Sequence, residues 1–370
     1  MRLSRRNLLV GAASAGALMA AAFLFPRQSE VPSILKVETV AKNLRVPWSI
    51  SFVSGDEALF TERHGSLKLL TLSSQRVEEV GFFDVSAVGE GGLLGLETVR
   101  NGRNTEVYLY HTYNAGGRLF NKVVKTVYNG ALEEKTDLIT NIPGGVVHNG
   151  GRIKLGPDGM LYVTTGEGGQ PSHSQDLGSL GGKILRASLD GKIPADNPFK
   201  TLVYAYGLRN PQGVAWRKGL NTMFCTDHGP SGEGLRYAHD EVNIVVAGGN
   251  YGWPEVIGDE AGPGFIKPLI HSGLETWAPS GCCFYNSGEI REWTGSFLFA
   301  VLRGQHLHQI ILSGENTVVA HSKLFDGLYG RLRDVVEGPD GALYVLTSNR
   351  DGRGSPTAED DRILRISARS

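Results

Sequence analysis

The sequence reads GPDGMLYVTT over Gly156–Thr165 and returns as GPDGALYVLT over Gly338–Thr347. Each copy is a Pro-Asp-Gly turn followed by a β-prone run, which is the pattern of a tight turn that starts a strand. Four weaker copies of this unit occupy other parts of the chain: Ser54–Thr61, Asn101–His111, Lys218–Thr226 and Trp293–Val301. A turn-plus-strand unit that recurs along the chain indicates an array of similar β-modules.

The length and composition favour one large β architecture. The chain has 370 residues, 50 of them Gly, and 41% of its residues are hydrophobic, which indicates many turns between short strands and excludes general disorder. Six modules leave roughly 57 residues each, enough for four short strands. The sequence therefore predicts an all-β fold, a six-bladed β-propeller with four-stranded antiparallel blades, as a single domain over residues 35–368.

Closure of the ring is also predicted. The last strand, Arg362–Ile366, is expected to pair with an N-terminal strand around Val37–Val40, because closure removes exposed sheet edges. The alternatives are an array of two β-sandwich domains and a parallel β-helix, but a β-helix would need a much shorter repeat.

Residues 1–26 form a separate segment. The run Ser4-Arg5-Arg6-Asn7-Leu8-Leu9 precedes an Ala/Gly-rich apolar stretch over Val10–Phe25. A twin arginine ahead of a mildly hydrophobic segment resembles a Tat export signal. We therefore expect a periplasmic or otherwise extracytoplasmic protein, soluble or tethered to the membrane through an uncleaved N-terminus. No clear A-x-A site precedes Pro26, so cleavage stays open.

Charge, cysteines and missing motifs exclude several classes of protein. The formal net charge is −1 and no block of like charges occurs, so nucleic acid is not an expected partner. Three cysteines cannot build a disulfide framework, and the adjacent pair Cys282–Cys283 is expected to remain reduced. The absence of G-x-G-x-x-G, Walker A, H-E-x-x-H and G-x-S-x-G motifs argues against nicotinamide, flavin-Rossmann and serine-hydrolase chemistry.

Polar or charged residues end the six repeated strands. The innermost strands of a propeller converge on a central channel, and the loops at one rim form the ligand pocket, so we expect a polar site where these residues cluster. At any single position the alternative explanation is equally good, because strand ends reach water and are often polar for that reason alone. The residues are Glu62-Arg63, His111, Gly166-Glu167, Asp227-His228, Arg303 and Ser348-Asn349.

Two further loops carry candidate catalytic residues. His148 stands beside Gly150 and Gly151, which permit close approach of a ligand. A neutral imidazole at the channel mouth can act as a general base, although a lone histidine is more often structural. Arg209, in a turn-rich loop, offers a planar fork for a carboxylate or an oxygen-rich ligand, or else braces its loop through backbone carbonyls.

Other loops carry candidate ligands for cations and anions. The turn at His228–Gly232 and the segments Asp240–Asn243 and Gly249–Pro254 offer carbonyl and carboxylate oxygens, which suit Ca²⁺. Arg331 and Arg333 share one face of a strand, with Asp334 on the other. Two cations on one face repel unless an anion or an acidic partner lies between them, so this pair suggests a multi-anionic ligand.

Taken together, these segments resemble the soluble aldose sugar dehydrogenases of the glucose/sorbosone dehydrogenase family, six-bladed propellers that use pyrroloquinoline quinone (PQQ). The matching pieces, in order, are Val46–Trp48, Leu59–Gly65, Gly91–Gly95, His148–Arg152, Pro157–Gly159, Gly181–Arg186, Asp196–Phe199, Gly207–Gly213, His228–Pro230, Asn250–Pro254, Arg331–Asp334 and Gly338–Gly341. The resemblance covers residues from about 35 to 368, and the order and density of its motifs make it specific.

The resemblance implies oxidation of an aldose at C1 to a lactone, with electrons passing to an external acceptor. His148 is then the base that removes the proton of the anomeric hydroxyl, while hydride passes from C1 of the sugar to C5 of PQQ. Arg209 and Asn210 contact the quinone. The remaining roles are those of ligands: the carbonyls of Gly229 and Pro230 for the Ca²⁺ that polarises PQQ, Glu241 and Tyr251 for a second, structural Ca²⁺, and Arg303, Arg331 and Arg333 for the PQQ carboxylates.

Three positions depart from the usual family pattern. Glu90 stands where a glutamine that touches PQQ is usual, and a carboxylate there repels the cofactor unless it is protonated or paired. Arg303 replaces a lysine, which keeps the charge but changes the shape. Val147 stands where some relatives place an acid, so another group must orient the ring of His148.

Two other functions fit parts of the pattern. A Ca²⁺-dependent hydrolase of the sugar-lactonase type would use the rim acids and the metal without PQQ. A non-catalytic binding propeller would have lost its cofactor site at Glu90.

Overall fold

The structure is a computed structural model, and it describes residues 30–102, 104–233 and 236–369. The expected export segment, residues 1–26, lies outside the described residues. In the part of the chain described, no helix is long and apolar enough to cross a bilayer. The cysteines Cys225, Cys282 and Cys283 are all free thiols, as predicted.

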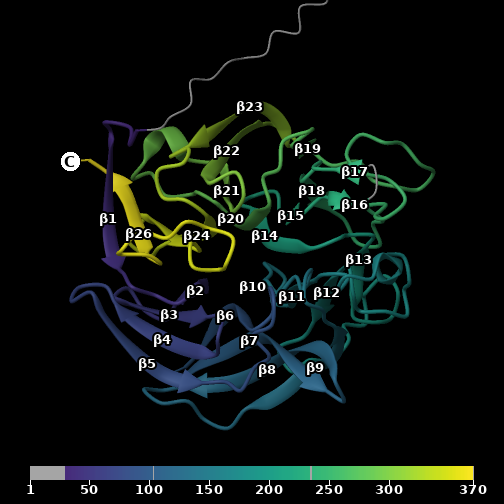
Figure 1. Ribbon diagram of the computed structural model, residues 1–370, viewed down its shortest axis with the longest axis horizontal. Coiled ribbons are helices and arrows are strands. Elements are labelled where there is room, and N and C mark those ends of the chain that lie inside the picture. The colour runs from purple at the N-terminus through teal and green to yellow at the C-terminus, as the bar shows by residue number, and fades with distance from the viewer. Residues whose placement is uncertain (1–29, 103, 234–235, 370) are drawn as a thin grey trace, which may run out of the picture.

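Six four-stranded antiparallel sheets, counted over the described residues, surround a common axis (Figure 1). This arrangement confirms the predicted propeller. The blades, from inner to outer strand, are β2 (Pro47–Phe52), β3 (Glu57–Glu62), β4 (Ser66–Thr71), β5 (Arg76–Phe82); β6 (Leu93–Asn101), β7 (Asn104–Ala115), β8 (Arg118–Tyr128), β9 (Thr136–Pro143); β10 (Ile153–Leu155), β11 (Leu161–Thr165), β12 (Lys183–Ala187), β13 (Val203–Tyr206); β14 (Pro211–Arg217), β15 (Thr222–Asp227), β18 (Glu241–Val245), β19 (Ile270–His271); β20 (Pro279–Phe284), β21 (Phe297–Val301), β22 (His306–Ser313), β23 (Thr317–Leu324); and β24 (Leu332–Glu337), β25 (Leu343–Thr347), β26 (Ile363–Ala368), β1 (Leu35–Ala41). A small hairpin, β16 (Ser231–Glu233) and β17 (Arg236–Tyr237), and two 3₁₀ turns, η1 (Pro171–Ser174) and η2 (Arg291–Trp293), lie in the loops.

The repeated unit is the second strand of each blade rather than the innermost one. Strands β3, β7, β11, β15, β21 and β25 hold this position, while β2, β6, β10, β14, β20 and β24 contact one another around the axis. The two strongest copies have the same local structure. Tyr162 donates to Asp158 (3.0 Å) and Tyr344 donates to Asp340 (3.1 Å), so each turn is tied to its strand by an aspartate.

The ring closes as predicted. The N-terminal strand β1 pairs antiparallel with β26, with Val37 opposite Ile366, and forms the outer strand of the last blade. The first and last strands of the described residues therefore share one sheet, which closes the ring.

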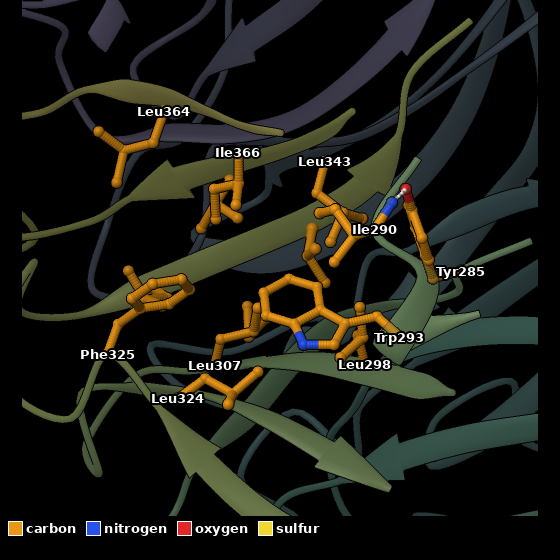
Figure 2. Close-up of a cluster of buried hydrophobic side chains, with 14 of the residues drawn as sticks. Tyr285, Ile290, Trp293, Leu298, Leu307, Leu324, Phe325, Leu343, Leu364 and Ile366 are labelled. Atoms are coloured by element: carbon orange, nitrogen blue, oxygen red, sulfur yellow. Dashed lines mark hydrogen bonds between the residues drawn. The ribbon is translucent and has the colours of Figure 1, made fainter. Parts of the chain in front are cut away.

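Each boundary between neighbouring blades has its own apolar core, and the described residues form six such clusters. Figure 2 shows the cluster between the fifth and sixth blades, where Trp293 and Leu298 face Leu343 and Ile366. Alternate residues of each strand point to opposite faces, so every sheet contributes to the cores on both of its sides. This packing fixes the rim loops relative to one another.

Candidate active site

A polar cavity of about 910 Å³ opens at one end of the ring. Its walls come from the loops that precede the inner strands and follow the second strands. Six of the residues predicted to act in catalysis or cofactor binding line this cavity together: Glu90, His148, Arg209, Arg303, Arg331 and Arg333. Asn210 is fully buried behind the wall, where its side-chain oxygen accepts the N–H of Gly150 (2.9 Å).

His148 is held by two carboxylates at different atoms. Its backbone lies in the left-handed region (φ 56°), and its N–H donates to Glu90 Oε2 (3.0 Å). Its ring Nδ1 makes a short hydrogen bond with Glu167, which is buried to 1% exposure. Gly166 lets the chain pass here, because a Cβ would lie 2.0 Å from the carbonyl oxygen of His148. Nε2 is therefore the ring atom available to a ligand in the cavity.

Glu167 is the group that orients the ring, a role that the apolar Val147 cannot fill. Its position at the end of a repeated strand made it a candidate for the polar site. Nothing in the sequence linked it to His148, nineteen residues away. The pairing arises because the loop before β10 and the end of β11 meet at the rim.

Glu90 is paired, so the repulsion that its sequence position suggested does not arise. Arg353 donates to its Oε1 (2.6 Å) across the mouth of the cavity. Although burial alone would raise its pKa, the guanidinium of Arg353 and the N–H of His148 lower the pKa of Glu90 to about 2. Glu90 is therefore an ionised carboxylate with its own counter-ion.

Arg331 and Arg333 already share an acidic partner, which corrects the interpretation that a ligand must supply it. Asp351 accepts from Arg331 Nε (2.9 Å) and lies 3.8 Å from Arg333 Nη2. Asp334 points to the other side of the strand, as predicted, and binds Arg152 (2.8 Å). One carboxylate for two guanidinium groups still leaves this wall positively charged.

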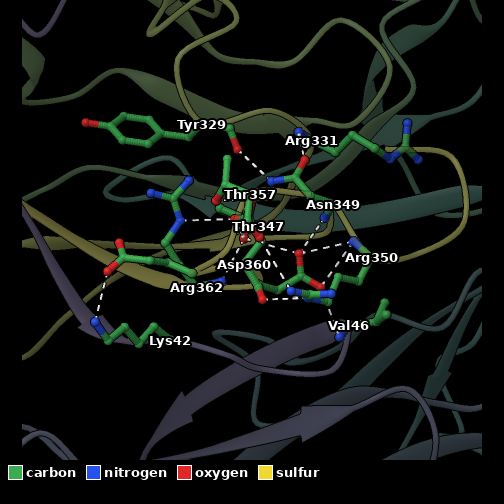
Figure 3. A network of polar contacts seen from close by, with 12 residues as sticks. Lys42, Val46, Tyr329, Arg331, Thr347, Asn349, Arg350, Thr357, Asp360 and Arg362 are labelled. Carbon is green, nitrogen blue, oxygen red and sulfur yellow. Dashed lines mark hydrogen bonds and ion pairs between the residues drawn. The ribbon is translucent and has the colours of Figure 1, made fainter. Parts of the chain in front are cut away.

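The loop that carries Arg331 is held by a polar network at the end of β25 (Figure 3). Asn349 accepts the backbone N–H of Arg331 (2.8 Å) and donates to the carbonyl of Tyr329 (2.9 Å). Asp361, in the same network, accepts the N–H groups of Asn349 and Val46 and so ties this loop to the start of the first blade. The network therefore fixes the position of the backbone that carries Arg331 in the cavity wall.

Trp48 and Arg152 form part of the floor of the cavity. Trp48 lines the cavity with 2% exposure, and the guanidinium of Arg152 lies 4.3 Å from the centroid of its ring. Arg152 is nearly inaccessible and also donates to Ser49 (2.9 Å) and to the carbonyl of Gln212 (2.9 Å). These contacts hold the floor of the cavity in place.

The expected calcium ligands lie together beside the cavity. Gly229, Pro230, Glu241 and Tyr251 line a small adjoining pocket of about 10 Å³, which shares Arg209 and His228 with the cavity. Burial and the nearby Asp227 raise the pKa of Glu241 to about 8. The carbonyl of Pro230 accepts the N–H of Ala238 (2.7 Å). The hydroxyl of Tyr251 donates to the carbonyl of Ile244 (2.8 Å) and accepts the N–H of Val246 (3.0 Å), so the free oxygen that Tyr251 offers a metal is that of its backbone.

No group of three or more His, Cys, Asp or Glu side chains among the described residues is arranged to hold a metal. The expected sites depend chiefly on carbonyl oxygens, which such a side-chain group does not include.

Not every polar strand end belongs to the site. Arg63, His228 and Arg303 line the cavity, whereas His111 is buried against Phe83, with ring centroids 6.4 Å apart. Ser348-Asn349 brace the arginine loop instead of facing the cavity. The expectation that all six strand ends meet in one site therefore holds only for some of them.

Unsatisfied polar atoms in the wall indicate what the cavity accepts. Nε2 of His228, Nε of Arg333 and Oγ1 of Thr276 are buried without a hydrogen-bond partner among the described residues. Burial lowers the pKa of His228 to about 3, so its imidazole is neutral. Buried polar groups normally have partners, so these atoms fit a bound polar ligand. Six arginines against two carboxylates in the lining favour a ligand with several negative charges.

Comparison with known proteins agrees with this geometry. The family profile described as Glucose / Sorbosone dehydrogenase matches residues 44–364. An aldose sugar dehydrogenase of Escherichia coli (strain K12) is 31% identical over 349 residues, which cover 87% of this chain and 92% of that protein. Quinoprotein glucose dehydrogenase B of Acinetobacter calcoaceticus is 29% identical over 433 residues, covering 88% and 87%.

A solved structure extends the likeness to three dimensions. The PQQ-bound aldose sugar dehydrogenase of Streptomyces coelicolor superimposes with a TM-score of 0.82 and 36% identity, over 92% of this chain and all of that chain. The matched profile covers most of the propeller, including the loops that line the cavity. The chain therefore belongs to the glucose/sorbosone dehydrogenase family.

Proposed function

We propose that this protein is a PQQ- and Ca²⁺-dependent dehydrogenase that oxidises aldose sugars at C1 to lactones. The observation that carries the proposal is the pair His148–Glu167 at the edge of a cavity walled by arginines. Membership of the family and the PQQ-bound relative support the same conclusion.

His148 acts as the general base. Glu167 accepts a hydrogen bond from Nδ1–H, which leaves the lone pair of Nε2 free to receive the proton of the C1 hydroxyl. When the ring becomes doubly protonated, the buried carboxylate of Glu167 stabilises the positive charge. The hydrogen bond from His148 N–H to Glu90 keeps the left-handed backbone in place, so the ring does not drift from its position.

The remaining residues bind and orient. Bound PQQ would supply the two-electron acceptor for the sugar. Arg303, Arg331 and Arg333 present donors for its carboxylates, and Arg209 together with Asn210 would contact its quinone edge. The backbone N–H groups of these last two residues donate to the two oxygens of Asp227 (2.9 and 2.7 Å), which fixes their loop.

For calcium, the oxygens of Gly229 and Pro230 suit the ion beside the cofactor, and those of Glu241 and Tyr251 suit a second, structural ion. Hard oxygen donors of this kind are the usual ligands of Ca²⁺. The proposal also includes an external electron acceptor and export through the N-terminal segment to an extracytoplasmic location, with or without a membrane tether.

Reconstitution tests the proposal. Purified protein loaded with PQQ and CaCl₂ should reduce an artificial dye when an aldose is added, and His148→Ala should lose most of kcat while it still binds PQQ. Hydrolysis of a sugar lactone by the metal-loaded, quinone-free protein without dye reduction would instead identify a hydrolase. A PQQ titration without any spectral change, at excess Ca²⁺, would indicate a binding propeller.

A further inference from the structure

Arg63 is a cation in the cavity wall to which the family resemblance assigns no role. It follows β3 in the first blade and lines the cavity. Its side chain is partly buried and makes no hydrogen bond or ion pair with any described residue. Burial lowers the pKa of Arg63, although the fields of Asp351 and Glu90 partly compensate. A partly buried guanidinium group without a partner has lost part of its hydration, which favours its pairing with an anion in the cavity.

The two nearby carboxylates are already committed to other arginines. Glu90 accepts from Arg353 (2.6 Å), and Asp351 accepts from Arg331 (2.9 Å). They act on Arg63 through their charge, but neither is bonded to it. The planar fork of Arg63 therefore keeps all its donors for a group inside the cavity.

The backbone beneath this side chain is firmly held. The N–H of Arg63 donates to Val46 (3.1 Å), and its carbonyl accepts from Leu93 (2.8 Å). Gly92 packs against the same carbonyl so closely that a Cβ would lie 2.0 Å from the oxygen. The loops of the first two blades thus fix the base of the side chain, which reduces the entropy lost when it binds a ligand.

The order of the blades places Arg63 on the same side of the cavity as the three arginines expected to bind the PQQ carboxylates. Arg303 follows β21 in the fifth blade, Arg331 and Arg333 belong to the sixth, and Arg63 belongs to the first. The inner strand of the sixth blade contacts those of the fifth and the first, so these arginines form a continuous arc. The third blade lies across the ring from the sixth (Figure 1), and the loops that carry His148 and Arg209 stand at its two boundaries.

We propose that Arg63 is a ligand-binding residue that completes this cationic arc and receives a carboxylate of the bound cofactor. The proposal rests on the proposed function, since it names a further contact of the same site. Arg63, Arg303, Arg331 and Arg333 would hold the carboxylates of such a ligand, and His148 would stand on the other side of it.

The test compares Arg63→Met with Arg118→Met, which removes the same charge from an exposed hairpin between β7 and β8. Loss of a charge-assisted pair predicts PQQ binding about 10- to 100-fold weaker in Arg63→Met, measured by fluorescence titration, and unchanged binding in Arg118→Met. Arg63→Lys should restore part of the affinity, because it returns the charge without the fork.

Thermal unfolding without ligand separates binding from a structural role. The melting temperature of ligand-free Arg63→Met should equal or exceed that of the wild type, because the substitution removes an unpaired cation. A clearly lower value would mean that Arg63 braces the fold and would overturn the inference, as would unchanged PQQ affinity.

Citrate, a simple tricarboxylate, separates this inference from the proposed function. If PQQ does not bind the wild type but citrate raises its melting temperature and not that of Arg63→Met, the anion site stands and the dehydrogenase proposal fails. If neither compound stabilises the wild type, the inference fails as well.

Discussion

Replacing Glu167 with glutamine tests the central pair of the site with almost no change in shape. The carboxylate is buried to 1% exposure, accepts Nδ1–H of His148, and also accepts the N–H of Gly169 (3.1 Å). In Glu167→Gln one of two things happens. If the amide oxygen takes the place of the carboxylate oxygen, the hydrogen bond remains and only its charge is lost. If the amide nitrogen takes that place, His148 is forced into the other tautomer and loses its basic Nε2.

The two cases set the expected range. Exchanging a charge-assisted hydrogen bond for a neutral one costs about 1–1.5 kcal/mol, or roughly tenfold in kcat. Loss of the basic nitrogen removes general-base catalysis, which contributes up to about 10⁴-fold. We therefore expect kcat to fall by between about 10-fold and 10⁴-fold, with Glu167→Asp falling less than Glu167→Gln because it keeps the charge.

The assay is dye-linked turnover of an aldose by PQQ-loaded protein, with PQQ affinity measured separately by fluorescence. Glu134→Gln, an exposed substitution of the same chemistry, serves as the control. A kcat for Glu167→Gln within twofold of the wild type would refute the positioning role. A loss of PQQ affinity as large as the loss of kcat would show that Glu167 supports the cavity as a whole instead.

Three further changes test the charge balance of the propeller. Arg353→Met should weaken PQQ binding about 10-fold because it leaves Glu90 unpaired, and adding Glu90→Gln to it should restore the affinity; failure of the double variant to recover would contradict this pairing. Burial raises the pKa of Asp361 to about 6, so the carboxyl is more easily protonated in the folded protein than in the unfolded chain. Its contribution to stability is then fully present below about pH 4 and is lost as the pH rises through 6, by about 3 kcal/mol relative to Asp361→Asn in denaturant titrations; a pH-independent difference would exclude it. Arg152→Met leaves Asp334 buried without its counter-ion and should lower the free energy of unfolding by about 3–5 kcal/mol, which a urea titration measures.

Some features could be read from the chain because their causes are local. A Pro-Asp-Gly turn before a β-prone run specifies its own geometry. Both strong copies of the motif, Gly156–Thr165 and Gly338–Thr347, form the same turn in the structure. Six such units with no helical periodicity leave few folds, and edge protection requires the ends of the chain to pair. Glycines such as Gly166, where a Cβ has no room, mark the loops that approach one another.

The partners of charged residues could not be read in this way. Arg331 and Arg333 looked like a pair without an anion, yet Asp351 lies between them. Glu90 looked like an obstacle to the cofactor, yet Arg353, 263 residues away, neutralises it. Neither partner shows any periodic or motif signal that links it to the residue it binds.

The sequence by itself determined the ring of blades, the closing strand and the loops in which His148 and Arg209 stand, because turn chemistry and strand alternation act over a few residues. Only the tertiary structure decided which carboxylate orients the histidine, which cations remain unpaired and where the cavity ends. These depend on contacts between different blades, and electrostatic energies depend on distance and burial, neither of which is encoded in the spacing of residues along the chain.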